Sequence, residues 1–241
     1  MLEVKGVIKR FGGLTAVDGI SVDVAEGEIL GIIGPNGAGK TTLFNLISGA
    51  ISPDEGEVVF NGERIDQLAP YIIAERGLVR TFQIVKPFGG LTVFENVLVA
   101  AFLRRSDPIE AAAHATSVLE YVGLGAFADR QSKGLTLAGR KRLELARTLA
   151  TDPKVLLLDE VLAGLTPTES AEMVTLVKAI RDGGVTVVVI EHVMAAIMAL
   201  SDRIAVIHHG ELLAVGLPSE IAKDPKVVEA YLGKEFQIAR D

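Results

Sequence analysis

The segment GPNGAGKTT, Gly34 to Thr42, constrains the fold more than any other part of this 241-residue chain. It follows the apolar run EILGIIG and precedes a stretch with Leu43, Leu46 and Ile47 at helical spacing. It matches the pattern G-x-x-x-x-G-K-[ST], in which glycines let successive backbone N–H groups converge on phosphate oxygens. The pattern therefore predicts a strand, a phosphate-binding loop and a helix, in that order.

Short apolar runs recur along the chain, among them VLLLDE, VTVVVIE and RIAVIHH. Between helical segments, such runs are typical of strands buried on both faces of a parallel sheet. We expect strands over 155–159, 185–190 and 203–208, with helices from 167 and over 193–200 between them. The sequence thus indicates an α/β fold around the phosphate-binding loop.

The N-terminal part has a different pattern, typical of half-buried antiparallel strands. Apolar residues alternate there in two registers, Leu2, Val4 and Ile8 in one and Ile20, Val22 and Val24 in the other. The dipeptide Asn61–Gly62 lies between EVVF and ERI and predicts a hairpin. An antiparallel β subdomain should therefore accompany the α/β core.

Residues from about 88 to 150 are predicted to be helical. Thr92 and Glu95 have capping-box spacing, and Asp107 stands before Pro108 as a helix start. A third helix, GRKRLELARTLATDP, ends before a proline. We therefore expect one domain over 1–241, with an α/β core and β subdomain in 1–87 and 151–241 and an inserted helical subdomain.

The composition excludes several classes of protein. The net charge is −7 and no block of basic residues is present, which argues against a nucleic-acid partner. Cysteine is absent, so a reducing compartment is suitable. No apolar run reaches the roughly 18 residues of a membrane-spanning helix, and the N-terminus does not resemble a signal peptide. These features predict a cytoplasmic protein.

Two carboxylates end the run VLLLDE and are the candidates for metal binding and catalysis. In a phosphate-loop protein, Asp159 would hold Mg²⁺ through water, and the hydroxyl of Thr41 would bind the same ion. Glu160, one residue later, is placed to act as a general base toward water. Gln83 follows another predicted strand and could ligate Mg²⁺ or position water. Without the loop, a solvated acidic strand end would be an equally good interpretation.

His192 ends the run TVVVIEH, and its role depends on the shared sheet. An isolated histidine at a strand end is more often structural than catalytic. Because the carboxyl ends of parallel strands face one crevice, we expect His192 near the phosphates, where it could stabilise transition-state charge. His114, His208 and His209 are interpreted as ordinary helix and turn residues, and we reject a zinc site.

The order of phosphate loop, Gln83, LTLAGRKRLELARTL, LLLDE and histidine resembles the ATP-binding cassette (ABC) family of ATPases over nearly the whole chain. The resemblance implies that ATP and Mg²⁺ are the cofactors and that Phe11 stacks on adenine. It implies catalytic roles for Glu160, His192 and Gln83, and metal binding by Thr41, Gln83 and Asp159. It implies nucleotide binding by Gly34, Pro35, Asn36, Gly37, Ala38, Gly39, Lys40, Thr41 and Thr42.

The stretch LTLAGRKRLE, residues 135–144, departs from the family pattern Leu-Ser-Gly-Gly-Gln. Thr136 keeps the hydroxyl and can cap the helix, while Ala138 carries a methyl group where the family usually has none. The resemblance implies that Thr136, Ala138 and Gly139 contact the nucleotide of a second subunit. Val161 and Thr166 are further departures, at positions where the family usually has Pro and Asp.

Within the family, RFGGLTAVDG, GLVRTFQ, LTVFENVLVAA and DPKVVEAYLG are most similar to ATPase subunits of branched-chain amino acid importers. That resemblance implies membrane permease subunits and a second ATPase subunit, identical or paralogous, as partners. A periplasmic or extracellular solute-binding protein would be an indirect partner, and the ATPase would lie on the inner face of the membrane.

Alternative functions differ in substrate or in class. Importers of urea or short amides carry similar ATPases. A non-transport ABC ATPase acting on DNA usually needs a long coiled-coil insertion, and one acting on ribosomes usually has two cassettes. A GTPase or small-molecule kinase would leave the 135–144 stretch unexplained, and the guanine-reading N-K-x-D is absent.

Overall fold

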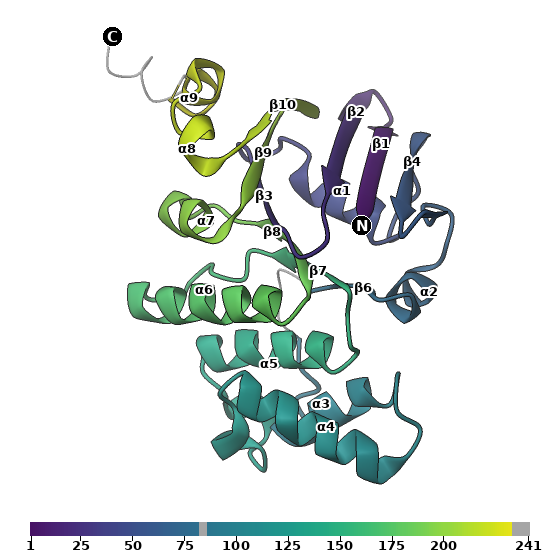
Figure 1. The fold of residues 1–241 in the computed structure, drawn as a ribbon, viewed down its shortest axis with the longest axis vertical. Coiled ribbons are helices and arrows are strands. Elements are labelled where there is room, and N and C mark those ends of the chain that lie inside the picture. Colours follow the sequence, from purple (N-terminus) through teal and green to yellow (C-terminus); the bar gives the residue numbers. More distant parts are fainter. Residues whose placement is uncertain (82–85, 233–241) are drawn as a thin grey trace.

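The computed structural model describes residues 1–81 and 86–232, which form two β-sheets with helices packed around them (Figure 1). The antiparallel sheet has the strand order β2-β1-β4-β5, and the larger sheet has the order β10-β9-β3-β8-β7-β6. The first consists of β1 (Leu2–Phe11), β2 (Leu14–Val24), β4 (Glu55–Phe60) and β5 (Glu63–Arg64). The second consists of β3 (Ile29–Ile33), β6 (Leu78–Arg80), β7 (Val155–Asp159), β8 (Thr186–Ile190), β9 (Arg203–His208) and β10 (Glu211–Gly216).

The larger sheet is parallel from β6 to β9, and only β10 runs antiparallel to its neighbour. Its apolar runs are continuous because both faces are buried. In β7, Leu156 and Leu158 join one hydrophobic core, while Val155 and Leu157 join the other. The predicted α/β core is therefore confirmed, and each buried strand contributes to two cores at once.

The helices cover both faces of the larger sheet. They are α1 (Lys40–Ile47), α2 (Pro70–Glu75), α3 (Val93–Ala101), α4 (Pro108–Tyr121), α5 (Leu137–Leu149), α6 (Pro167–Asp182), α7 (Met194–Leu200), α8 (Pro218–Ile221) and α9 (Pro225–Leu232). Short 3₁₀ turns occupy Gly125–Phe127 and Ser132–Gly134. Helices α3, α4 and α5 lie together at the end of the molecule farthest from the antiparallel sheet (Figure 1). In the described part of the chain, no helix is both long and apolar enough to cross a membrane.

The helix starts follow the predicted capping residues. The side chains of Thr92 and Thr136 each accept a hydrogen bond from the backbone N–H three residues later. Thr166, which the sequence analysis named only as a departure from the family pattern, caps α6 in the same way. Asp107 caps α4 in the same way, with Pro108 at the first helical position. Local sequence therefore sets where these helices begin. Helices α2, α8 and α9 are short and were not predicted.

The predicted register of the first strand is wrong beyond Val4. Ile8 was expected on the same face as Leu2 and Val4, but Val7 is the buried residue and Ile8 is only partly buried. The pairing of β1 with β2 is irregular between Val4 and Val7, and Gly6 there has a φ of 55°. A bulge adds one residue to a strand and so moves the following side chains to the opposite face.

The hairpin at Asn61–Gly62 is confirmed. Phe60 pairs with Glu63 across a two-residue turn, in which Asn61 and Gly62 have φ values of 50° and 80°. Positive φ at both central positions is the geometry that Asn-Gly turns favour. The antiparallel sheet is thus closed by the turn that the sequence indicated.

Candidate nucleotide-binding site

The phosphate loop leaves β3, a central strand of the larger sheet, and enters α1. Its glycines are required by close backbone contacts: a Cβ at Gly34 would lie 2.1 Å from the carbonyl oxygen of Ile207. A Cβ at Gly39, where φ is 106°, would lie 2.4 Å from the carbonyl oxygen of Ala16. No side chain fits in either place, so the loop can keep this path only with glycine at both positions.

Lys40 is buried at the centre of the loop. Its Nζ donates to the carbonyl oxygens of Gly34 at 2.7 Å and Pro35 at 3.0 Å. Burial lowers the pKa of Lys40, and the nearby carboxylates of Glu160 and Asp159 oppose that effect. A bound phosphate would compete with the two carbonyls for this ammonium group.

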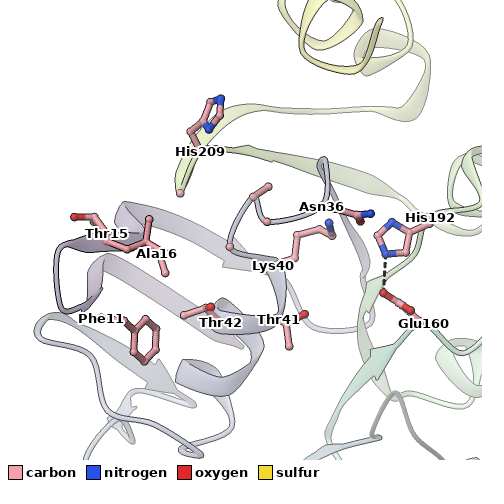
Figure 2. Close-up of a pocket in the computed structure, with 15 residues that line it drawn as sticks. Phe11, Thr15, Ala16, Asn36, Lys40, Thr41, Thr42, Glu160, His192 and His209 are labelled. Atoms are coloured by element: carbon pink, nitrogen blue, oxygen red, sulfur yellow. Dashed lines mark hydrogen bonds and ion pairs between the residues drawn. The ribbon is translucent and has the colours of Figure 1, made fainter. Parts of the chain in front are cut away.

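A cleft of about 440 Å³ lies over the loop. Figure 2 shows Phe11 at one end, Glu160 and His192 at the other, and Lys40 and Thr41 between them. Phe11 is half-exposed, and Nζ of Lys9 lies over its ring at 5.7 Å from the ring centre. The cleft is lined by residues from five segments, namely Phe11 with Leu14 to Ala16, Asn36 to Thr42, Glu160, His192, and His209 with Gly210. Gly34 and Pro35 do not line it.

Glu160 and His192 meet because their strands are neighbours. Asp159 pairs with Ile190 in the parallel register, and the amide of Glu160 donates to the carbonyl oxygen of Ile190 at 3.0 Å. The Nε2 atom of His192 lies 2.6 Å from Oε1 of Glu160 (Figure 2). A carboxylate and an imidazole in this contact can share or relay a proton.

Asp159 lies deeper than the cleft. Its carboxylate accepts a hydrogen bond from the guanidinium of Arg80 at 2.6 Å, and both side chains are almost completely buried. The same guanidinium donates to Oδ1 of Asn45 at 2.5 Å. Arg80 was not predicted from the sequence, although a charged residue directly after two apolar residues of a short strand was a usable signal. Gln83 lies outside the described residues.

The start of α5 is not part of this cleft. Thr136, Ala138 and Gly139 line a different cavity, also about 440 Å³, which includes no residue of the phosphate loop. Thr136 Oγ1 accepts from the amide of Gly139 at 3.1 Å, as expected for a helix cap. Within a single chain, Thr136, Ala138 and Gly139 therefore do not lie at the phosphate loop.

Two buried charged residues, Lys141 and Glu191, lie close to the Glu160 loop in space and were not predicted from the sequence. Nζ of Lys141 donates to the carbonyl oxygen of Glu160 at 2.6 Å, and Oε1 of Glu191 accepts from the amide of Leu162 at 2.6 Å. Burial raises the pKa of Glu191 to about 6. Glu191 directly precedes His192 in the sequence, which was a usable signal, whereas Lys141 adjoins no proposed catalytic residue.

The raised pKa of Glu191 predicts a pH-dependent stability. The folded state binds this proton more tightly than the unfolded state, so stability falls as pH rises from about 4.5 through about 6. A shift of this size corresponds to about 2 kcal/mol. Urea unfolding measures the free energy of unfolding of wild type and of Glu191→Gln. We expect the free energy of wild type, relative to that of the variant, to fall by about 2 kcal/mol between pH 4 and pH 7. A pH-independent difference would contradict the raised pKa.

Comparison with known proteins places the chain in a family. The family model described as "ABC transporter" matches residues 17–163, and the model "Branched-chain amino acid ATP-binding cassette transporter" matches residues 211–237. The chain belongs to the ABC transporter family. It is accordingly an ATP-binding subunit with ATPase activity, as the order of motifs implied.

Curated relatives match the cassette over nearly its full length. One is the high-affinity branched-chain amino acid transport ATP-binding protein BraF of Pseudomonas aeruginosa, with 43% identity over 97% of this chain and 98% of the relative. Another is the corresponding protein LivG of Escherichia coli, with 40% identity over 97% and 98%.

Solved structures confirm the cassette fold. A nucleotide-free ATP-binding cassette of an ABC transporter superposes with a TM-score of 0.88 at 32% identity, covering 96% of this chain and 98% of the other. A dimeric cassette in a post-hydrolysis state, bound to ADP and Pi, has a TM-score of 0.81 at 26% identity, covering 90% and 99%. That second protein binds nucleotide as a dimer.

Proposed function

We propose that this cassette hydrolyses Mg-ATP to drive import of branched-chain amino acids through a membrane permease. The observation that carries the chemistry is the contact of Glu160 with His192 at one end of a cleft whose floor is the phosphate loop. The names of BraF and LivG support the choice of substrate. The cassette would act as a head-to-tail dimer on the cytoplasmic face of the membrane.

The residues at and below the cleft suit Mg²⁺. Mg²⁺ prefers oxygen ligands, and Thr41 offers a hydroxyl while Asp159 offers a carboxylate held in place by Arg80. Thr41 would bind the ion directly, Asp159 would bind it through water, and Gln83 is the third proposed ligand. When bound, the ion would neutralise charge that develops on the β- and γ-phosphates.

The remaining residues take roles that follow from their places in the cleft. Phe11 would stack on adenine, and Gly34 to Thr42 would surround the phosphates, with the ammonium group of Lys40 turned toward them. Glu160 would accept a proton from the attacking water. His192 would orient Glu160 through the 2.6 Å contact and donate toward the γ-phosphate.

Purification from solubilised membranes tests the transport function. A tagged cassette should co-purify with permease subunits, and the reconstituted complex should hydrolyse ATP faster with a leucine-loaded than with an unloaded solute-binding protein. Urea or a short amide serves as the comparison solute. Stimulation by urea alone would reassign the substrate, and recovery of DNA-bound or ribosomal partners without a permease would contradict a transport function.

We propose that residues 85–94, at and before the start of α3, form part of the permease docking site; residue 85 lies outside the described residues. The backbone of Phe88 is held by the side chains of Asn96 and Ser132, through bonds of 2.9 Å from its amide to Asn96 and from Ser132 to its carbonyl. Phe88 is 47% exposed, and the centre of its ring lies 4.7 Å from the guanidinium of Arg147. An aromatic ring displayed by a fixed backbone is typical of an interface anchor.

Phe88→Asp should abolish permease binding without unfolding the cassette. The backbone bonds remain, and the new carboxylate can pair with Arg147, so the melting temperature and basal ATPase should stay close to wild type. Ile109→Asp is the matched control, since Ile109 is exposed and apolar but lies in α4, outside the segment proposed for docking. Co-purification measures binding. A large loss of melting temperature in Phe88→Asp would instead assign the segment to a buried hinge.

A further inference from the structure

Glu160 has a backbone conformation that side chains seldom adopt. Its φ is 52°, in the left-handed region that normally favours glycine. Such a conformation persists only where surrounding groups hold it, and it is concentrated at functional sites. The contacts that fix this backbone therefore also fix the direction of the Glu160 carboxylate.

Hydrogen bonds from several directions hold the loop from residue 160 to residue 162, and one of them is local, from the amide of Ala163 to the carbonyl oxygen of Glu160 at 3.2 Å. The amide of Glu160 is bonded to β8, as described above. Lys141 donates to the carbonyl oxygen of Glu160, and Glu191 accepts from the amide of Leu162, each at 2.6 Å. Lys141 is 5% exposed and Glu191 is 2% exposed. Two buried ions of opposite charge thus hold one short loop from two sides.

The chemistry of these contacts explains why charged groups serve here. A hydrogen bond with an ionised donor or acceptor is shorter and stronger than a neutral one. Burying an ammonium group and a carboxylate is costly. The attraction between them offsets only part of that cost, because burial still lowers the pKa of Lys141 and raises that of Glu191. Both groups direct a hydrogen bond at the backbone, so they act on its geometry.

We propose that Lys141 is a positioning residue for Glu160, connecting the catalytic carboxylate to the first turns of α5. This inference rests on the proposed role of Glu160 as general base. Lys141 lies in the 135–144 stretch, two residues after Gly139. The start of α5 is the part of this chain proposed to contact the nucleotide of a second subunit. Movement of α5 on dimer closure would therefore move the backbone of Glu160 directly.

Lys141→Met tests the proposal, because methionine keeps a long apolar side chain and removes the donor. We expect kcat to fall about 10- to 100-fold, the range that a small misplacement of a catalytic group produces. KM for ATP and binding of a fluorescent ATP analogue should change less than about twofold, because interactions made only in the transition state act on kcat. Lys141→Arg, which keeps a cation donor, should recover part of the loss.

A double variant separates positioning from charge balance. Lys141→Met alone leaves Glu191 buried without its neighbouring cation, which by itself could lower the melting temperature. Lys141→Met with Glu191→Gln removes both charges and keeps an amide oxygen that can accept from Leu162. Recovered melting temperature with kcat still low supports the proposal. Wild-type turnover in the double variant would overturn it, since Lys141 would then only neutralise Glu191.

Two controls identify which idea fails. Arg104→Met also removes a cation that donates to backbone carbonyls, those of Thr151 and Ala74, but Arg104 lies away from the loop and from the 135–144 stretch. It should turn over ATP as wild type does. Glu160→Gln, measured in parallel, should be inactive. Full turnover in Glu160→Gln would refute the proposed general base, whereas an inactive Glu160→Gln beside a fully active Lys141→Met would refute only the role of Lys141.

Discussion

Glu160→Gln should bind ATP as wild type does but hydrolyse it about 10²–10⁴-fold more slowly, the usual contribution of general-base catalysis. The amide has the shape of the carboxylate and can keep the 2.6 Å contact with His192. It cannot accept the proton of the attacking water. The backbone that positions it, with its amide on Ile190 and its carbonyl on Lys141, is unchanged by the substitution.

The same variant should also accumulate an ATP-bound dimer. The carboxylate of Glu160 is negative beside the γ-phosphate, and glutamine removes that repulsion. Steady-state phosphate release measures turnover, and gel filtration with ATP measures association. Glu110→Gln, an equivalent change in the first turn of α4, should leave both measurements at wild-type values. Wild-type turnover in Glu160→Gln would exclude Glu160 as the general base.

Two inactive variants, Lys40→Ala and Ala138→Asp, should restore ATP-dependent association when they are mixed. Lys40→Ala removes the buried ammonium group of the phosphate loop. Ala138→Asp places a carboxylate at the start of α5, where an acidic residue suits the helix dipole and the fold should tolerate it. Each homodimer should fail because both of its sites contain one damaged component.

The mixed dimer differs because each site is built from two chains. One site combines the intact loop of the Ala138→Asp chain with the intact Thr136 stretch of the Lys40→Ala chain, and the other site is damaged twice. In the Ala138→Asp homodimer, the carboxylate would face phosphate. Two unit charges 4 Å apart repel by about 4 kcal/mol at an effective dielectric constant of about 20. That energy weakens association by about 10³-fold.

Ala138→Asn is the matched control, since it has nearly the size of aspartate without its charge and should still associate. Association is measured by gel filtration with ATP after subunit exchange has been verified with differently tagged chains. If the mixture fails to associate while wild type does, the 135–144 stretch does not contact the partner's nucleotide. It would then be an ordinary capped helix.

Much of this molecule is determined by local sequence. The strand–loop–helix around Gly34–Thr42 could be predicted because glycine spacing and flanking apolar runs suffice to specify it. The helix starts at Thr92, Asp107 and Thr136 could be predicted because a capping side chain bonds to its own next turn. Continuous apolar runs indicated strands buried on both faces, since no solvent-facing residue interrupts them.

One tertiary contact, that of Glu160 with His192, could also be predicted from the sequence. Glu160 and His192 each follow a buried parallel strand, and such strands end at one edge of the sheet. Their 2.6 Å contact is the result. The register of β1 could not be anticipated in the same way, because the bulge at Gly6 depends on pairing with two other strands.

Only the tertiary structure decided which charged side chains contact Asp159 and the loop from residue 160 to residue 162. Arg80 meets Asp159 because β6 lies beside β7, although 79 positions separate the two residues. Lys141, rather than Arg140 or Arg142, reaches Glu160 because the rotation of α5 against the sheet turns that one position inward. Helical spacing in the sequence fixes which residues share a face, but packing against the rest of the core decides where that face points.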